Sequence, residues 1–356
     1  MGSIRGKKVV NALSKGKLVI LIDKNEHGKL ISLVEKVTPE DINFMVTHAK
    51  GFLSVAMENS RANQLDFTSQ NGVEHYNYHT FTVSVDVEGT TTGISAFERH
   101  DTIKALIDPN RKSEEFKRPG HVFPVLAHEN GIYGKQSHTE VSLELAKRSG
   151  SYPAVVMCDL LNEKGELSSL KEMEEFSSRF ELEIMQINDF LHDFIQSQPA
   201  FTVKKKSKVK TRNGEFDLIS FSNKFDPLCD QILIHHSAYS KEITPVYIHE
   251  PCDQCQLKLC DCQLNLDKAL TEIKRLGGGV CIFLKDRAEE NSVLTLFGES
   301  HQTLIIRQIL LAIGVSEISL QNNYALDHSL LKDIKIHSFE SAAIVASGRG
   351  MRRDVV

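Results

Sequence analysis

Three short blocks rich in glycine, hydroxyl and ionisable residues lie in order between Gly89 and Glu140 of this 356-residue chain. Small hydroxyl residues beside glycine let a backbone approach an anion closely and donate hydrogen bonds to it. Arginine and histidine supply fixed positive charge, a general acid or base and a metal ligand. The stretch therefore predicts a site for a phosphorylated, oxygen-rich small molecule. The blocks are Gly89-Thr90-Thr91-Thr92-Gly93-Ile94-Ser95-Ala96, Arg118-Pro119-Gly120-His121-Val122-Phe123-Pro124 and Ser137-His138-Thr139-Glu140.

A single block of this kind decides little, because Thr-Thr-Gly is a common turn and Arg-Pro-Gly a common loop opening. All three in order resemble the 3,4-dihydroxy-2-butanone-4-phosphate synthase family, whose members convert ribulose 5-phosphate into a four-carbon phosphate and formate in the riboflavin pathway. That family carries TTG-x-SA-x-D/E-R, RPGHVFP and GHTE blocks at similar spacings. The resemblance covers roughly residues 8 to 195. It implies an α/β (α+β) fold, with a mixed sheet covered by helices.

The resemblance also implies a lyase site with a metal. In the family a divalent ion, usually Mg²⁺ and alternatively Mn²⁺, chelates vicinal oxygens of the sugar phosphate while carboxylates move protons. His138 is the implied metal ligand, and Asp159 stands where the family has a catalytic glutamate. The resemblance further implies that Thr91, Thr92, Lys135 and Thr139 hold the phosphate, that Arg118 helps to bind the substrate, and that His121 assists catalysis.

The segment from Asp23 to Lys29 departs most from the family. It follows an apolar, β-branched run that predicts a buried strand over 17–23. The family has an acidic loop of the pattern DDEDRENEGD there, whereas this chain has a loop about two residues shorter with few acids. Two interpretations stay open. The segment is a solvated turn, or Glu26 and His27 form a rebuilt catalytic pair in which Glu26 also binds the metal.

A second resemblance, to GTP cyclohydrolase II, begins at Thr211 and implies a smaller α/β domain. It rests on 211–217, 249–252 and 258–264. The family binds zinc through three cysteines, which map onto Cys252, Cys260 and Cys262, and Cys255 offers a fourth thiolate. Four thiolates would make a closed, structural zinc site. The alternative is a group of reduced thiols without a metal.

The cyclohydrolase resemblance is incomplete. The family's RGQEGRGIGL block is replaced by residues 285–291, and the region after it is shortened. We therefore expect no GTP hydrolysis, and a domain that stabilises, dimerises or regulates the first one. The predicted organisation is a synthase-like domain at 1–200, a basic linker at 201–210 and the degenerate domain at 211–356.

Composition limits the cell location and the partners. Hydrophobic residues make up 41% and charged residues 25% of the chain, as in soluble globular proteins. A formal net charge of -5 argues against nucleic acid or an anionic membrane as a general partner. No apolar run is long enough to span a bilayer, and the N-terminus has no apolar signal core. A cytoplasmic location is therefore expected, and the family resemblance adds the expectation of a homodimer that binds a small phosphorylated sugar.

Three functions stay open from the sequence. The chain is a divergent synthase, or an enzyme of another biosynthetic pathway acting on a related sugar phosphate. Otherwise it is a non-catalytic homologue that binds a metabolite or regulates an active partner. Four large rings stand where the family usually has small residues, and two interpretations of them stay open: they reshape the pocket, as the second function requires, or they form a polar strand end. These rings are His75, Tyr76, Tyr78 and His79.

Overall fold

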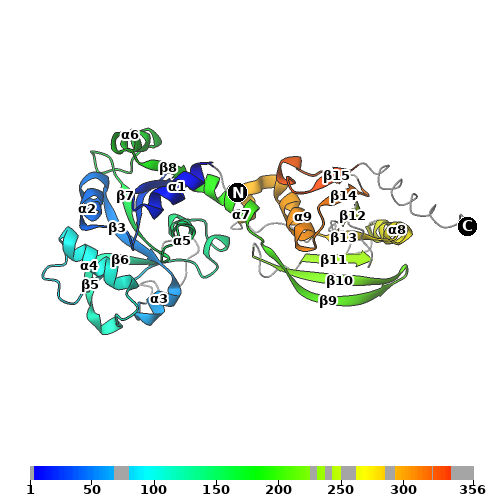
Figure 1. Cartoon of the computed structure of the whole chain (residues 1–356), viewed down its shortest axis with the longest axis horizontal. Coiled ribbons are helices and arrows are strands. Elements are labelled where there is room, and N and C mark those ends of the chain that lie inside the picture. The colour runs from blue at the N-terminus through cyan, green and yellow to red at the C-terminus, as the bar shows by residue number, and fades with distance from the viewer. Residues whose placement is uncertain are drawn as a thin grey trace, which may run out of the picture. The chain divides into compact units, whose positions relative to one another are not determined.

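The computed structural model describes residues 4–67, 80–224, 231–236, 243–249, 262–284, 293–322 and 324–337 (Figure 1). The chain divides into two compact units, Met1–Ser197 and Gln198–Val356. Cys252, Cys255 and Cys260 lie outside the described residues, as do the four rings at 75–79, so the predictions about them stay predictions. Cys262 begins a helix of the second unit.

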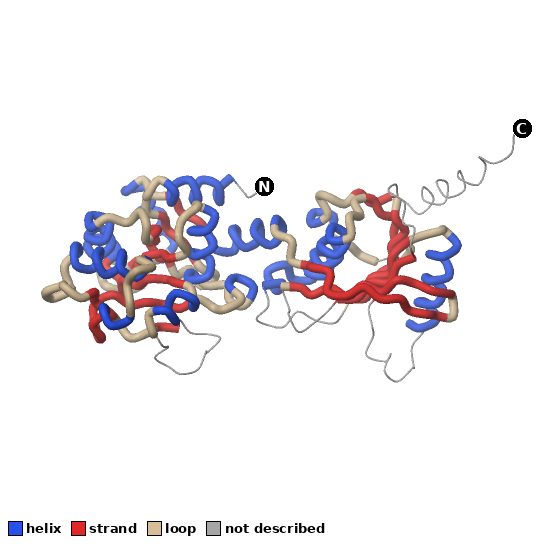
Figure 2. Tube along the Cα trace, turned by 60° about the horizontal axis from the view of Figure 1, so that its bottom comes forward, coloured by secondary structure: helices blue, strands red, loops and turns tan. Residues whose placement is uncertain are grey.

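A mixed sheet forms the centre of the first unit, with helices on both of its sides (Figure 2). Among the described residues the strand order is β4-β6-β3-β7-β2-β1-β8, and β5 pairs with β6. The strands are β1 (Val19–Ile22), β2 (Gly28–Leu33), β3 (Lys50–Met57), β4 (Thr80–Phe81), β5 (Val85–Val87), β6 (Phe116–Leu126), β7 (Ala154–Leu160) and β8 (Glu183–Gln186).

The helices of the first unit alternate with these strands along the chain, as expected for an α/β fold. They are α1 (Ile4–Ser14), α2 (Pro39–Phe44), α3 (Asn59–Gln64), α4 (Ala96–Ile107), α5 (His138–Arg148), α6 (Leu170–Phe180) and α7 (Ile187–Ser197). Shorter helical turns are η1 (Met45–Ala49), η2 (Ser113–Glu115) and η3 (Gly131–Tyr133).

The two faces of the sheet carry different side chains, because successive residues of a strand point to opposite sides. One face supplies a core that includes Val55 and Cys158 and is closed by residues of α2, α4 and α6, such as Ile42, Ile103 and Met173. Helix α5 packs across β3, β7 and β2. The hydroxyl of its Ser142 lies 3.9 Å from the sulfur of Met157 on β7, so α5 covers the opposite face.

The second unit contains another mixed sheet, with the order β15-β14-β12-β13-β11-β10-β9. Phe216, Leu270, Ile273 and Cys281 form a buried cluster between this sheet and α8. The described elements are β9 (Phe201–Thr211), β10 (Gly214–Asn223), β11 (Gln231–His236), β12 (Thr244–His249), α8 (Cys262–Arg275), β13 (Gly279–Phe283), η5 (Val293–Ser300), α9 (His301–Ala312), β14 (Glu317–Leu320), η6 (His328–Leu330) and β15 (Lys335–His337).

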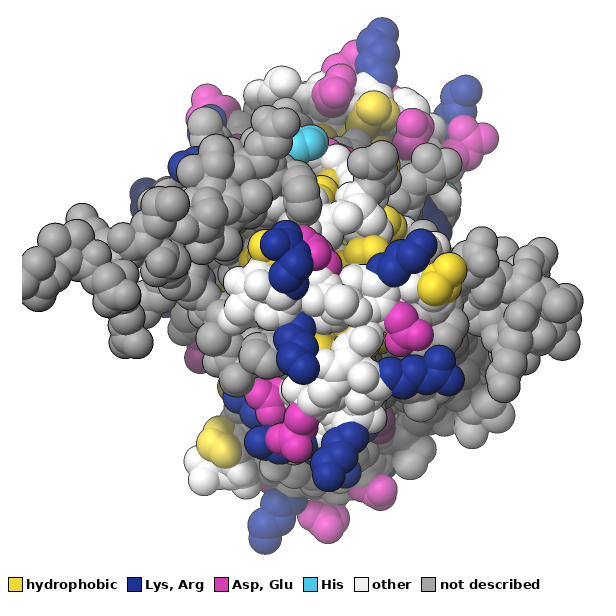
Figure 3. Space-filling view, turned by 90° about the vertical axis from the view of Figure 1, so that its right-hand side faces the viewer, with side chains coloured by type: hydrophobic (Ala, Val, Ile, Leu, Met, Phe, Trp, Pro, Cys, Tyr) yellow, Lys and Arg dark blue, Asp and Glu magenta, His cyan; other side chains and the backbone are white. Residues whose placement is uncertain are grey.

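The sequence predicted a linker at 201–210, but this basic segment forms most of strand β9. The strand pairs antiparallel with β10. Its lysines are exposed because β9 is an edge strand of the sheet, where long charged side chains stay in water and discourage pairing with other chains. Lys208 forms a 2.7 Å ion pair with Glu215 on β10. On the face shown in Figure 3, Lys and Arg side chains lie among acidic ones. Among the described helices, none is long and apolar enough to cross a membrane.

Candidate active site

Asp159 and Lys29 form an ion pair at one end of the first sheet. They are register partners on β7 and β2, and the Lys29 ammonium donates to Oδ1 of Asp159. The side chains of Lys29 and Asp159 are 12% and 25% exposed. Since Asp159 lies two residues beyond Met157, the pair is on the face that α5 covers. The sequence resemblance pointed to the carboxylate, but not to the ammonium group that neutralises it.

The neighbouring strands bring His121 toward the same end of the sheet. A Cβ atom at Gly51 on β3 would lie 2.1 Å from the carbonyl oxygen of Asp159, so glycine lets β3 pass close to it. Phe123 on β6 pairs with Ser54 on β3, and His121 lies two residues before Phe123. His121, Gly51, Asp159 and Lys29 thus lie on four adjacent strands, which in a sheet are about 4.8 Å apart.

His138 connects the start of α5 to the shortened loop. It is the first residue of the helix and buried, and its Nε2 lies 3.1 Å from the carbonyl oxygen of His27. Ser137 caps the helix by accepting a hydrogen bond from the Thr139 backbone N–H. The predicted metal ligand therefore contacts the backbone of the loop that was expected to face it.

The loop from Asp23 to Gly28 is a tight turn stabilised by its own carboxylate. The side chain of Asp23 accepts hydrogen bonds from the backbone N–H groups of Asn25 and His27, both at 2.9 Å. A Cβ atom at Gly28 would lie 2.0 Å from the sulfur of Met173, so the loop packs closely on α6. Glu26 is exposed with φ 62°, and the His27 side chain is about half exposed. The geometry supports the turn interpretation and leaves the catalytic interpretation a prediction.

Thr139 carries the clearest sign of a ligand. The residue is 1% exposed, and its hydroxyl has no hydrogen-bond partner among the described residues. It lies in the first turn of α5, where backbone N–H groups and the helix dipole favour anions. A buried hydroxyl without a partner is unfavourable, so a ligand oxygen would satisfy it. Lys135, four residues earlier, is partly buried near the same end of the helix.

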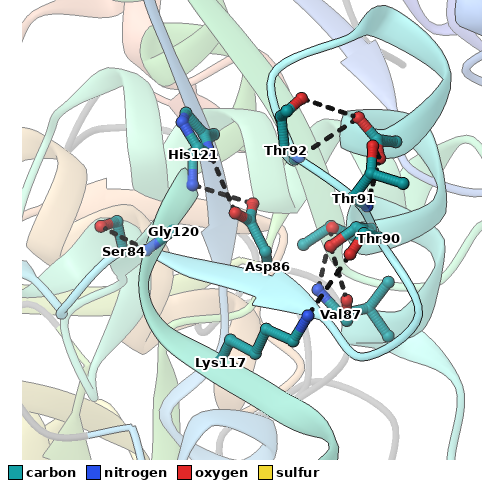
Figure 4. A network of polar contacts seen from close by, with 12 residues as sticks. Ser84, Asp86, Val87, Thr90, Thr91, Thr92, Lys117, Gly120 and His121 are labelled. Atoms are coloured by element: carbon teal, nitrogen blue, oxygen red, sulfur yellow. Dashed lines mark hydrogen bonds and ion pairs between the residues drawn. The ribbon is translucent and has the colours of Figure 1, made fainter.

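His121 is oriented by Asp86, a residue that the motifs did not single out (Figure 4). Oδ2 of Asp86 lies 2.8 Å from Nδ1 of His121, and Oδ1 accepts the His121 backbone N–H at 2.9 Å. Asp86 is buried on β5 between Val85 and Val87. An acid inside a short apolar strand needs a buried partner, and this signal in the sequence could have identified it.

The turn at Thr91, Thr92 and Gly93 binds an anion, as predicted for a phosphate. The anion is the side chain of a nearby glutamate and not a ligand. The Glu98 carboxylate accepts hydrogen bonds from the backbone N–H and hydroxyl of Thr91 at 2.6 and 2.7 Å. It also accepts the Gly93 N–H at 3.2 Å, and the Thr92 hydroxyl is 3.4 Å away. Hydrogen bonds from Thr91, and then from Ser95, lower the pKa of Glu98 to about 2. The two threonines predicted to bind phosphate therefore contact the carboxylate of Glu98 in the same chain.

Arg118 is likewise engaged by the protein. Its guanidinium donates to the carbonyl oxygens of Leu65 and Asp66, at 2.7 and 3.1 Å, and to the Ser113 hydroxyl at 2.9 Å. It also lies over the ring of Phe67. These contacts hold the end of α3 and the segment after it. Arg118, Thr91 and Thr92 therefore have local partners, whereas His121, Asp159, His138 and Thr139 gather around one end of the sheet.

The residues predicted to bind Mg²⁺ do not form a fitting set in this arrangement. Among the described residues, no group of three or more His, Cys, Asp or Glu side chains could hold a metal ion. Glu26 is exposed, His138 Nε2 contacts a backbone carbonyl, and Asp159 is paired with Lys29. We therefore derive no chemical step through a metal.

Comparison with known proteins agrees with both resemblances. The family described as 3,4-dihydroxy-2-butanone 4-phosphate synthase matches residues 7–192, and GTP cyclohydrolase II matches residues 202–302. The riboflavin biosynthesis protein RibBA of Bacillus cereus is 34% identical over 288 residues, which are 79% of this chain and 72% of that protein. RibBA of Bacillus cytotoxicus is 32% identical over 290 residues, with the same coverage of both chains.

Solved structures are similar over different lengths. RibBX, a two-domain 3,4-dihydroxy-2-butanone 4-phosphate synthase from A. baumannii, gives a TM-score of 0.71 at 25% identity and covers 94% of this chain and 99% of its own. A 3,4-dihydroxy-2-butanone 4-phosphate synthase in complex with two magnesium ions gives 0.50 at 30% identity, over 54% of this chain and 96% of its own. The chain thus belongs to the 3,4-dihydroxy-2-butanone 4-phosphate synthase family and carries a GTP cyclohydrolase II-type domain behind the synthase domain.

Proposed function

We propose that the first unit is an enzyme of the 3,4-dihydroxy-2-butanone 4-phosphate synthase type, acting on ribulose 5-phosphate or a related sugar phosphate. The observation that carries this proposal is the buried hydroxyl of Thr139, which has no partner among the described residues. It lies in the first turn of α5, next to His138, where a phosphate oxygen would accept its hydrogen bond.

The proton transfers are assigned to groups on the sheet. In this reaction a proton leaves a carbon beside the ketone, and later steps release one carbon as formate. The exposed edge of the His121 ring is the proposed acceptor of the first proton. Asp159 is the proposed second proton-transfer group, and the Lys29 ammonium compensates its charge. Lys135 and the first turn of α5 hold the phosphate.

The direct test is to incubate the purified chain with ribulose 5-phosphate, with and without Mg²⁺, and to follow formate and the four-carbon phosphate by NMR. The magnesium-bound relative motivates the metal arm. Formate release that is lost in His138→Ala and retained in Lys50→Gln is the expected result. Lys50 is the matched control because it pairs with the exposed Glu163 on the surface. Absence of formate would overturn the proposal.

A different reaction on the same class of substrate is the second candidate. This candidate is favoured because two acidic side chains make contacts within the protein. Asp23 stabilises its own turn, and Asp159 is paired with Lys29. Fewer free carboxylates would support fewer proton transfers. A product other than formate and the four-carbon phosphate would identify this function, and stabilisation by substrate without any product would identify a binding protein.

We further propose that the second unit does not hydrolyse GTP, because residues 285–291 replace the family's glycine-rich block. Its proposed roles are structural zinc binding and assembly of a cytoplasmic homodimer. The zinc proposal is tested by the zinc content of the wild type and of Cys260→Ala. Formate release from GTP tests for hydrolysis, and the molecular mass in solution tests for a homodimer. A metal-free wild type would remove the zinc proposal. The proposed ligands are Cys252, Cys255, Cys260 and Cys262.

A further inference from the structure

We propose that Asp86 is a positioning residue that fixes the tautomer of His121, so that Nδ1 carries the hydrogen and Nε2 is the proton acceptor of the neutral ring. The part of this inference that concerns catalysis rests on the proposed function. The part that concerns the ring is a property of the folded chain and can be measured without any substrate.

The argument starts from the chemistry of the two groups. An ionised carboxylate only accepts hydrogen bonds, and a neutral imidazole has one donor and one acceptor nitrogen. Because Oδ2 of Asp86 lies 2.8 Å from Nδ1 of His121, the hydrogen must be on Nδ1. The lone pair of the neutral ring is then on Nε2. A general base needs that lone pair on the nitrogen that reaches the substrate.

The second contact fixes the position of the ring. Oδ1 of Asp86 accepts the backbone N–H of the same histidine at 2.9 Å, so one carboxylate binds both the side chain and the main chain of His121. The Asp86 side chain is 9% exposed, whereas that of His121 is 39% exposed. The carboxylate is thus the buried end of the pair, and the imidazole is the more exposed end. Figure 4 shows the two side chains facing each other.

Two glycines allow the chain to pass close to Asp86 and to the strand that carries it. A Cβ atom at Gly93 would lie 2.1 Å from Oδ2 of Asp86, and one at Gly120 would lie 2.1 Å from the carbonyl carbon of Val85. The Gly120 N–H donates to the hydroxyl and the carbonyl oxygen of Ser84, at 3.1 and 3.0 Å. The TTG and RPGH blocks therefore meet at Asp86, and their glycines allow the close approach that aligns Asp86 with His121.

The test is ¹⁵N NMR of the imidazole nitrogens, assigned by loss of the signals in His121→Gln. The wild-type neutral ring is expected to be protonated at Nδ1. In Asp86→Asn the amide donates to Nδ1, so the neutral ring should be protonated at Nε2. With ribulose 5-phosphate, kcat should fall about 10²- to 10⁴-fold in this variant, with KM changed less than about threefold because the phosphate contacts remain.

Asp101→Asn is the matched control, because Asp101 also lies beside a histidine, with 3.3 Å between its Oδ1 and Nδ1 of His100, but is exposed. It should leave the His121 signals and kcat unchanged. Protonation at Nε2 in the neutral wild-type ring would overturn the inference whether or not the chain is active, and so would full kcat in a folded Asp86→Asn variant. If the wild type releases no formate, the proposed function fails and the NMR result still decides the tautomer. The wild-type measurement also decides it if Asp86→Asn does not fold.

Discussion

The two sides of the candidate site use their carboxylates differently. On the β5–β6 side, Asp86 accepts two hydrogen bonds from His121, and Glu98 accepts several from the turn at Thr91. On the β2–β7 side, Asp159 is bound by the Lys29 ammonium. On the first side a carboxylate accepts hydrogen bonds from uncharged groups and orients the His121 ring, whereas on the second side a positive charge compensates a negative one. The first side thus agrees with the proposed role of His121 as a proton acceptor, and the second with the proposed charge compensation of Asp159 by Lys29.

This difference matches the positions along the chain of the motifs that resemble the family. The β5–β6 side contains two of the three blocks that resemble the family, and the β2–β7 side contains the shortened loop. The loop of the second side still contacts the start of α5, through the His27 carbonyl oxygen and His138. The motifs shared with the family and the proposed phosphate site at the start of α5 thus lie outside the shortened loop, which belongs to the β2–β7 side.

The largest expected effect is that of Gly120→Ala, which would separate the strands of the β5–β6 side. The new Cβ atom would lie 2.1 Å from the Val85 carbonyl carbon, where only backbone could move. We expect the free energy of unfolding of the first unit to fall by about 3 kcal/mol or more, measured by urea denaturation.

Gly165→Ala is the control for Gly120→Ala. Gly165 has φ 79° and open space around its Cβ position, so alanine there should cost only about 1 kcal/mol from backbone strain. Equal losses in the two variants would show that the β5–β6 contact is not close, which would weaken the contrast between the two sides.

Removal of the cation from the β2–β7 side should have the next largest effect. Lys29→Met leaves the mostly buried Asp159 without its partner, and we expect a loss of about 2 kcal/mol in the free energy of unfolding. Lys50→Met is matched to it, since Lys50 lies 2.7 Å from Glu163, whose side chain is 93% exposed. That surface pair should contribute less than about 1 kcal/mol. If the free energy of unfolding falls equally in Lys29→Met and Lys50→Met, Lys29 does not compensate a buried charge.

The parts of the fold that the sequence predicted depend on contacts close together in the chain. The run Thr38-Pro39-Glu40-Asp41 is typical of a helix start, and in the structure Thr38 and Asp41 form a capping box with Pro39 in the first turn of α2. The apolar run at 17–23 contains β1, as its β-branched composition predicted. Capping and strand burial depend on residues a few positions apart, so a linear pattern is enough to predict them.

The pairs that define the site are distant in the sequence. Lys29 and Asp159 are 130 positions apart and meet only because β2 and β7 are neighbours in register. Asp86 and His121 are 35 positions apart and meet through the pairing of β5 with β6. The lysine-rich segment 201–210 resembled a solvated linker, because its position at the edge of a sheet cannot be read from its composition.

A smaller effect, with opposite signs for stability and binding, is expected at Thr139 in the first turn of α5. Thr139→Val replaces a buried hydroxyl that has no partner among the described residues with a methyl group of similar size. The free energy of unfolding should stay constant or rise by up to about 1 kcal/mol, because an unpaired polar group is removed. Affinity for ribulose 5-phosphate should fall about tenfold, measured by calorimetry. Thr102→Val, which removes a hydroxyl that accepts the Val87 N–H at 3.0 Å, should instead destabilise the fold.

The smallest effect is expected from Glu98→Gln, and it appears as a dependence on pH. Hydrogen bonds from Thr91 lower the pKa of Glu98 from 4.5 to about 2, so its ionised form stabilises the folded state. That stabilisation is complete above about pH 5, where the unfolded carboxyl is also ionised. It is lost as the pH falls from about 4.5 to about 2, because the unfolded chain takes up the proton first. The difference in Tm between wild type and Glu98→Gln should therefore shrink over this range.

Glu114→Gln removes the same charge from an exposed position in η2, and its difference in Tm from the wild type should show no such loss between pH 4.5 and pH 2. Because Glu98 is exposed to water, the change in Tm should be smaller than that of Lys29→Met. A difference for Glu98→Gln that stays constant over the same pH range would mean that the turn does not bind the carboxylate. Thr91 and Thr92 would then be available to an external phosphate, and the β5–β6 side would contribute to binding as well as to proton transfer.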